Sequence, residues 1–560
     1  MKSPLIRIAS GLAAAGLLLA ACGNDGPAGL FSENTVTISI VYGSEKREWL
    51  EPLVAEYNAA RHTTPGGAII VVEATPMGSI ESVYGILEER LKPVVWSPAS
   101  SVYIPVANAE WRKTRSSDLV AGKPNDLVLS PVVIAMWRSM AEALGWPDKP
   151  IGWADIAALA TSSKGWAEYG YPEWGQFKFG HTHPDFSNSG IVSILAIAYA
   201  GAGKQRGLTQ ADLARPEVRD FMEQVERSII HYGSSTGFFG ERMFERGPSY
   251  LSAAVLYENL VVAQEKKRLA GQSAQLPVVA IYPKEGAFWT NNPYVILNAP
   301  WVTEEQKTAA QAFEKFLLDR PQQLRAIELG FRPADPAIPL GAPLDAQHGV
   351  DPTQPRTVLE VPSAQVIQSV QQLWRQTKKP VDVVALIDIS GSMKGDKIST
   401  ARTSLIQFIN LLSDRDRLQV TTFASQVAPL TPLSALSDKR TELTRRVSGI
   451  VEGGNTRLYD AVIAAHQELQ ANGDPNHIRA IVVLSDGKDT ASTAGLDEAL
   501  TAISDTGEEG GAAIKLFTIG FGEDADREAL KRLAEATGGK QYDSTPDNIH
   551  KIYAEIATFF

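Results

Sequence analysis

The chain has 560 residues, of which 44% are hydrophobic and 21% are charged, and its formal net charge is −11. This length is too great for a single hydrophobic core and predicts two or three folded domains. The acidic balance, together with the lack of a basic stripe interleaved with aromatic residues, argues against a nucleic-acid partner.

Residues 1–21 have the pattern of a secretory signal peptide: two basic residues precede an apolar run over residues 8–19. That run is shorter than the roughly 20 apolar residues that span a bilayer. It ends in Leu19-Ala20-Ala21-Cys22, which resembles the lipobox of bacterial lipoproteins. The resemblance implies that Cys22, the only cysteine of the chain, is lipidated and that residues 22–34 form a tether. We therefore expect an exported protein anchored to the outer face of a bacterial membrane, or held in the periplasm or at the outer membrane of a two-membrane envelope.

Residues 35–345 alternate between predicted strands and helices, which indicates an α/β fold. Residues 36–42 form a predicted strand that ends in Gly43-Ser44, and residues 94–97 form another that leads to Ser100-Ser101. Ser187-Asn188-Ser189-Gly190 precedes an apolar helix expected over residues 191–199. Helix amino termini of this kind present backbone N–H groups to anions or polar ligands.

These turns, with Tyr257-Glu258-Asn259-Leu260 and Gly330-Phe331-Arg332-Pro333, resemble the bacterial extracellular solute-binding proteins of the type 2 periplasmic class. The resemblance implies two α/β lobes joined by crossing strands, with a cleft between them for a small-molecule ligand. Each serine could instead be an ordinary helix N-cap. The residues that matching turns place at the cleft are Ser44, Ser100, Ser101, Ser189, Tyr257 and Glu258.

Residues 346–378 are expected to form a linker and a helix between two folded units. The stretch from 334 to 361 is rich in Pro and Gly, whereas residues 363–376 have an apolar stripe at helical spacing. We expect this helix to pack against one or both units and to limit their relative motion. Earlier in the chain, His181-Thr182-His183 has the strand spacing of paired zinc ligands, but without a nearby third ligand we favour a structural pair.

Residues 379–560 are expected to form a second α/β domain with a doubly wound sheet. A last helix over residues 549–559 carries a terminal Phe-Phe that could pack on this sheet or contact a partner. The predicted strands cover residues 382–388, 418–423, 479–485 and 514–520, and two further helices cover residues 397–412 and 525–537.

This domain contains three polar turns next to predicted strands or helices. Asp388-Ile389-Ser390-Gly391-Ser392 leaves an apolar strand, Gly453-Gly454-Asn455-Thr456 precedes a helix, and Ser485-Asp486-Gly487 ends another strand. Ligands collect outside the carboxyl ends of strands in an open α/β sheet, so these turns are expected to meet. Their carboxylate and hydroxyl oxygens suit Mg²⁺, Mn²⁺ or Ca²⁺. The alternative is a set of capping and turn residues that hold no metal.

The same turns resemble the von Willebrand factor A (VWA) domain and its metal-ion-dependent adhesion site. The resemblance implies that the two serines, and the threonine in the liganded state, bind Mg²⁺ directly while the two aspartates act largely through water. One coordination position then stays open for an acidic side chain from a partner protein. The five matching positions are Asp388, Ser390, Ser392, Thr456 and Asp486.

The chain has no phosphate loop and no His-Glu-x-x-His motif, so we do not expect an enzyme. The expected function is divalent-metal-dependent protein binding, or adhesion, by a surface-anchored lipoprotein with an appended solute-binding-like module. One alternative is the substrate-binding lipoprotein of an ABC-type uptake system with an accessory VWA domain. Another is an assembly or chaperone role, in which the VWA domain docks onto an ATPase or a pilus component.

Overall fold

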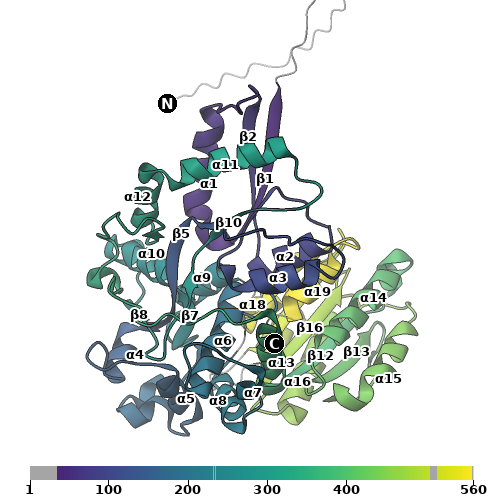
Figure 1. Cartoon of the computed structure of the whole chain (residues 1–560). Coiled ribbons are helices and arrows are strands. Elements are labelled where there is room, and N and C mark those ends of the chain that lie inside the picture. The colour runs from purple at the N-terminus through teal and green to yellow at the C-terminus, as the bar shows by residue number, and fades with distance from the viewer. Residues whose placement is uncertain (1–33, 231, 234, 505–513, 558, 560) are drawn as a thin grey trace, which may run out of the picture.

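The computed structural model describes residues 34–230, 232–233, 235–504, 514–557 and 559 (Figure 1). The expected signal peptide, Cys22 and all but the last residue of the expected tether lie outside these residues. Within them, no helix is both long and apolar enough to cross a membrane. The described chain contains three sheets, which form two amino-terminal lobes and a carboxyl-terminal domain.

The first lobe is built on a five-stranded sheet at the top of Figure 1. Strand β1 pairs in parallel with β2 and β3, whereas β10 returns from much later in the chain and runs antiparallel to β3. Its strands in spatial order are β2 (Ile69–Pro76), β1 (Thr35–Tyr42), β3 (Val95–Ser97), β10 (Pro293–Ile296) and β4 (Asn125–Asp126). Its helices are α1 (Arg47–Ala59), α2 (Ser79–Leu87), α3 (Ile104–Trp111), α11 (Glu304–Leu318) and α12 (Arg320–Glu328).

The second lobe is built around β5 (Val128–Trp137), a long strand that is buried along almost its whole length. The chain enters this lobe where β4 runs into β5, leaves it where β9 runs into β10 and returns to it from α12 at β11, so three connections cross between the lobes. The other strands are β6 (Phe179–Gly180), β7 (Ala253–Tyr257), β8 (Val278–Ile281), β9 (Trp289–Thr290) and β11 (Arg332–Pro333). The helices are α4 (Arg138–Ala143), α5 (Trp153–Thr161), α6 (Asn188–Ala202), α7 (Gln210–Leu213), α8 (Pro216–Glu226), α9 (Thr236–Arg246) and α10 (Glu258–Leu269).

The carboxyl-terminal sheet has the order β14-β13-β12-β16-β17-β18, with β15 paired to β13. Strands β13, β12, β16, β17 and β18 are parallel. The chain moves outward on one side of β12 and then returns to its other side, which places the topological switch point between β12 and β16. The strands are β12 (Val381–Asp388), β13 (Arg417–Phe423), β14 (Val427–Pro429), β15 (Ser434–Ala435), β16 (Ile478–Ser485), β17 (Lys515–Phe521) and β18 (Lys540–Ser544).

Helices cover both faces of this sheet, as a doubly wound fold requires. They are α14 (Asp396–Leu411), α15 (Leu436–Ser448), α16 (Leu458–Asn472), α17 (Leu496–Ile503), α18 (Arg527–Ala536) and α19 (Ile549–Ala557). Helix α19 is described as far as Ala557, and the helix was expected to reach residue 559. The ring of Phe559 packs 4.8 Å from that of Phe517, and its carbonyl accepts the N–H of Tyr232 at 3.4 Å, so the chain end joins the sheet to the second lobe.

Helix α13 (Ala364–Thr377) lies between the lobes and the carboxyl-terminal domain (Figure 1). It packs against α3 of the first lobe and against α6, α7 and α8 of the second. The Gln368 amide donates to Glu110 of the first lobe at 3.2 Å, and the Arg375 guanidinium donates to Asp185 of the second at 2.7 Å. The helix therefore contacts both lobes and then runs through Lys378 into β12.

Candidate metal centre and interlobe contacts

The candidate metal centre begins where β12 ends. Asp388 is the last residue of that strand, and its buried Oδ1 accepts the backbone N–H of Ser390 at 2.8 Å, which sets the turn. Ser485 ends the neighbouring parallel strand β16, and its hydroxyl donates to Asp388 Oδ2 at 2.6 Å. The carboxyl ends of the two strands thus share one edge at the switch point, where the doubly wound fold places ligands.

Hydrogen bonds connect four of the five residues predicted to bind a metal. Ser390 Oγ lies 3.0 Å from Ser392 Oγ, and the Ser392 hydroxyl donates to Asp486 Oδ1 at 2.7 Å. Asp388 joins the group through its bond to the Ser390 backbone. Both carboxylates are fully buried at the sheet edge, and Ser390 is buried with them.

The fifth residue, Thr456, is brought to the same edge by the glycine turn before it. The N–H of Gly391 donates to the Gly454 carbonyl at 3.1 Å, and the N–H of Gly453 donates to the Ile389 carbonyl at 2.7 Å. Gly454 has a φ of +95°, and a Cβ there would lie 2.6 Å from Ser425 Oγ, so this turn requires glycine. Thr456 is buried, and its N–H donates to Thr490 Oγ1 at 2.9 Å.

Two buried carboxylates at one edge create a strongly anionic site. Burial raises the pKa of the Asp388 carboxyl above its ordinary value; the charge of Asp486 adds to the shift, and hydrogen bonds from Ser390 and Ser485 oppose it. An ammonium reduces the negative charge, because Lys397 Nζ lies 2.6 Å from Asp486 Oδ2. Sequence reasoning missed Lys397, since a single lysine at the start of a helix gives no sign of its partner.

The described residues contain no group of three or more His, Cys, Asp or Glu side chains suited to a metal ion. A metal at the sheet edge would therefore depend on hydroxyl ligands. The histidine pair agrees with its expected structural role: His181 Nε2 lies 3.0 Å from Glu226 Oε1, whereas the His183 ring packs edge-on against Trp374. Burial lowers the pKa of His183 to about 3.

The two amino-terminal lobes are joined by direct bonds between polar side chains. Ser44 Oγ, which follows β1 of the first lobe, lies 3.2 Å from Ser235 Oγ of the second. The Ser100 hydroxyl donates to Asn188 Oδ1, at the start of α6, at 2.6 Å. Both predicted serines thus face the opposite lobe, and both are bonded to it.

The network continues into the second lobe. The Asn188 amide donates to the Tyr257 hydroxyl at 3.1 Å, and the Thr236 hydroxyl lies 3.3 Å from the same oxygen. Thr236 also donates to Ser189 Oγ at 2.9 Å. Four of the six residues predicted for the cleft, namely Ser44, Ser100, Ser189 and Tyr257, therefore lie in or beside one set of hydrogen-bonded side chains between the lobes.

The other two predicted residues have different surroundings. Ser101 is half-buried, and its backbone N–H donates to Asn291 Oδ1 at 2.8 Å. Glu258 is fully buried away from this network, where it accepts two hydrogen bonds from Arg332, at 2.8 and 2.6 Å, and one from Tyr282. It was assigned to the cleft as the neighbour of Tyr257, but adjacent residues at a strand end point in different directions.

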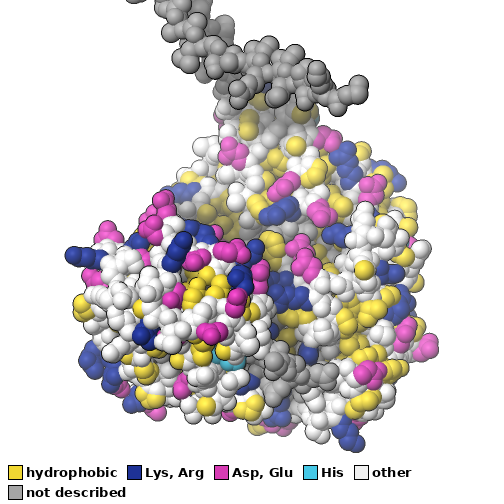
Figure 2. Space-filling model, turned by 180° about the vertical axis from the view of Figure 1, so that it is seen from behind, with side chains coloured by type: hydrophobic (Ala, Val, Ile, Leu, Met, Phe, Trp, Pro, Cys, Tyr) yellow, Lys and Arg dark blue, Asp and Glu magenta, His cyan; other side chains and the backbone are white. Residues whose placement is uncertain are grey.

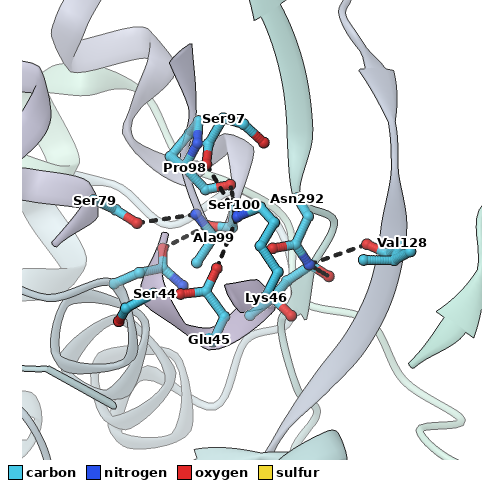
Figure 3. Close-up of polar contacts among 12 residues, drawn as sticks. Ser44, Glu45, Lys46, Ser79, Ser97, Pro98, Ala99, Ser100, Val128 and Asn292 are labelled. Atoms are coloured by element: carbon cyan, nitrogen blue, oxygen red, sulfur yellow. Dashed lines mark hydrogen bonds and ion pairs between the residues drawn. The ribbon is translucent and has the colours of Figure 1, made fainter. Parts of the chain in front are cut away.

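A buried ion pair next to Ser44 was also missed (Figure 3). Lys46 is fully buried, and its Nζ lies 2.9 Å from Glu45 Oε1 and donates to the Ser97 carbonyl at 3.0 Å. Burial lowers the pKa of this lysine. Two buried polar atoms of the same region, Ser97 Oγ and Asn292 Oδ1, have no hydrogen-bond partner. This part of the first lobe is therefore packed around polar groups.

Two family models match the chain. The model for bacterial extracellular solute-binding proteins matches residues 38–332, and the model for the von Willebrand factor type A domain matches residues 382–555. An uncharacterized protein of Mycobacterium tuberculosis is 23% identical over 528 residues, which cover 90% of this chain and 73% of that protein. Inter-alpha-trypsin inhibitor heavy chain H4 of Homo sapiens is 29% identical over 170 residues, which cover 29% of this chain but only 18% of that relative.

Solved structures of both kinds resemble the chain. A periplasmic thiamin binding protein covers 61% of this chain and 96% of its own, with 11% identity and a TM-score of 0.43. A von Willebrand factor type A protein from Catenulispora acidiphila covers 32% and 42%, with 22% identity and a TM-score of 0.29. Because the first family model spans more than half of the 560 residues, the chain belongs to the bacterial extracellular solute-binding proteins, an exported class, and carries a VWA domain after the solute-binding domain.

Proposed function

We propose that this protein is a lipid-anchored binding protein whose VWA domain holds a partner protein through a divalent metal ion at the Asp388–Asp486 edge. The observation that carries the proposal is the 3.0 Å separation of the Ser390 and Ser392 hydroxyl oxygens, with Asp486 bonded to the second of them. The solute-binding domain is a second binding module of the same chain.

The two hydroxyls are hydrogen-bonded to each other at 3.0 Å, and this spacing is also compatible with two ligands of a small ion. Two ligands at right angles, each about 2.1 Å from Mg²⁺, lie about 3.0 Å apart, whereas the longer bonds of Ca²⁺ would separate them by about 3.3 Å or more. Because Ser392 donates its proton to Asp486, it accepts the hydroxyl of Ser390 with one lone pair and keeps the other for a metal. The donor set is thus suited to Mg²⁺ or Mn²⁺, with Asp388 and Asp486 acting through bound water.

The charge of the ligands supports an acidic partner group. Hydroxyl ligands are neutral, so a bound ion would keep much of its positive charge and attract a Glu or Asp side chain into its open position. On the face shown in Figure 2, the acidic and basic side chains of the described residues are interspersed, and no broad basic patch is visible there. The net charge of −11 also favours a protein partner over a nucleic acid.

A retention experiment tests the metal-dependent contact. The full chain, immobilised and exposed to proteins of the native cell envelope, should retain its partner in Mg²⁺ and release it in EDTA. Ser392→Ala should abolish retention, because it removes one hydroxyl ligand and the bond to Asp486. Ser399→Ala on the exposed face of α14 is the matched control and should behave as the wild type. Equal retention in EDTA would contradict the proposal.

The lipid anchor is tested separately, by cell fractionation. Cys22→Ser is expected to move the protein from the membrane fraction to the soluble fraction and to prevent incorporation of labelled fatty acid. Membrane retention of the variant would count against lipidation at Cys22.

Solute uptake is a second candidate function, favoured by the hydroxyl-rich network that Ser100, Asn188 and Tyr257 form between the lobes. In that case a small polar molecule would compete for the same donors and acceptors. Native mass spectrometry of the purified chain distinguishes the two candidates. A stoichiometric small ligand that is lost in Tyr257→Phe would favour uptake, whereas a ligand-free chain that still retains a protein in Mg²⁺ would favour adhesion.

A further inference from the structure

We propose that Lys397 sets the strength of divalent-metal binding at this centre, because its ammonium and the metal draw on the same carboxylate, Asp486. This inference rests on the proposed metal-dependent function and concerns a residue outside the predicted ligand set. Lys397 lies in the first turn of α14, four residues after Met393 of the Asp388 turn.

The geometry divides Asp486 between two donors. Its Oδ1 accepts the Ser392 hydroxyl at 2.7 Å, and its Oδ2 accepts Lys397 Nζ at 2.6 Å. The carboxylate is fully buried, whereas the lysine side chain remains 28% exposed. Asp486 is therefore fixed in place, while Lys397 has a path to solvent.

A second strand end holds the lysine in this position. Gly522 follows β17 with a φ of +87°, and a Cβ built there would lie 3.5 Å from Lys397 Cε and 3.6 Å from Nζ. The β17–α18 turn thus lies near the end of the lysine side chain. This turn and Asp486 flank the Lys397 side chain, whereas Lys394 in the preceding loop is exposed.

The charge balance gives the direction of the effect. Asp388 and Asp486 carry two negative charges at the sheet edge when ionised, and the nearby ammonium reduces the total from −2 to −1. A divalent cation binds more tightly to the site of charge −2, both because Asp486 is free to engage its water and because a repulsive charge is gone. Removing a unit charge about 6 Å from a divalent ion in a water-like dielectric should change affinity about tenfold.

The alternative is that Lys397 only orients Asp486, in which case its removal would weaken metal binding. The two roles predict changes of opposite sign. A matched set of variants separates them: Lys397→Met and Lys397→Gln remove the charge, Lys397→Arg keeps it, and Lys394→Met removes a charge from an exposed lysine of the loop before α14. Two neutral variants are used so that a folding defect in one leaves the other to be measured.

The test is titration of the full chain with Mn²⁺, with the free ion followed by electron paramagnetic resonance. Melting curves in EDTA establish that each variant is folded. We expect Lys397→Met and Lys397→Gln to bind Mn²⁺ about tenfold more tightly than the wild type, and Lys397→Arg and Lys394→Met to stay within about threefold of it. Mg²⁺ should displace the bound Mn²⁺ in every case.

Unchanged or weaker binding by both neutral variants would overturn the role of Lys397 while leaving the proposed metal-dependent function intact. Failure of Mn²⁺ to bind either the wild type or the neutral variants would instead overturn both. Binding by the neutral variants alone would support the competition directly.

Discussion

Replacing Trp374 by Ala should loosen α13 from the second lobe. This indole is fully buried, and its ring packs edge-on against His183 at 4.8 Å and against Tyr232 at 5.4 Å. Aromatic pairs of this kind contribute about 0.5–1.5 kcal/mol each beyond their burial. Loss of a buried Trp side chain, including the cavity that remains, costs about 3–5 kcal/mol.

The ion pair made by the next residue, Arg375, provides a comparison for the stability cost of losing Trp374. Arg375 and Asp185 are 49% and 24% exposed in their side chains, so their pair is screened by water and Arg375→Ala should cost about 0.2–1 kcal/mol. Urea denaturation followed by circular dichroism measures the free energy of unfolding of each variant, and trypsin cleavage after Lys378, a site that both variants keep, reports local release of the helix. If Arg375→Ala destabilised the protein as much as Trp374→Ala, the apolar anchor would not be what holds α13.

Two further substitutions test buried charge in the lobes. Lys46→Met leaves Glu45 without its partner and should cost about 3–5 kcal/mol in urea denaturation, most of which Lys46→Met combined with Glu45→Gln should restore; no recovery would contradict the assigned pair. His183 has a folded-state pKa of about 3 against an ordinary value of 6.5, so the unfolded chain takes up a proton that the folded chain does not, and stability falls as the pH falls through this window. The loss should be about 2 kcal/mol between pH 7 and pH 5, and His183→Asn should remove it; an unchanged profile would refute the assignment.

The fold of the carboxyl-terminal domain could be predicted because its strands are apolar runs that end in polar turns. Each of the four predicted strands differs from the observed strand by one residue at one or both ends. The first, for example, was predicted over 382–388 and is observed over Val381–Asp388. The α/β character of both halves is confirmed by the two family models. The residues predicted to bind a metal occupy neighbouring turns because parallel strands on either side of a switch point end at one edge.

Contacts between distant charges could not be predicted in the same way. Lys397 and Asp486 are separated by 89 positions, and no local pattern reports their pairing. Glu258 was assigned to the cleft because it follows Tyr257, yet its partner Arg332 lies 74 positions away. Periodicity reveals which residues are buried, but the partner of a buried charge depends on how the elements pack.

The position of a bound metal ion tests the central claim most directly. Crystals of the full chain grown with Mn²⁺, measured at an energy where manganese scatters anomalously, would locate the ion without reference to any partner protein. The account predicts one strong anomalous peak about 2.1–2.2 Å from both the Ser390 and Ser392 hydroxyl oxygens, with water between the ion and Asp388. No peak at this edge under saturating Mn²⁺, or a peak at a different part of the chain only, would contradict it.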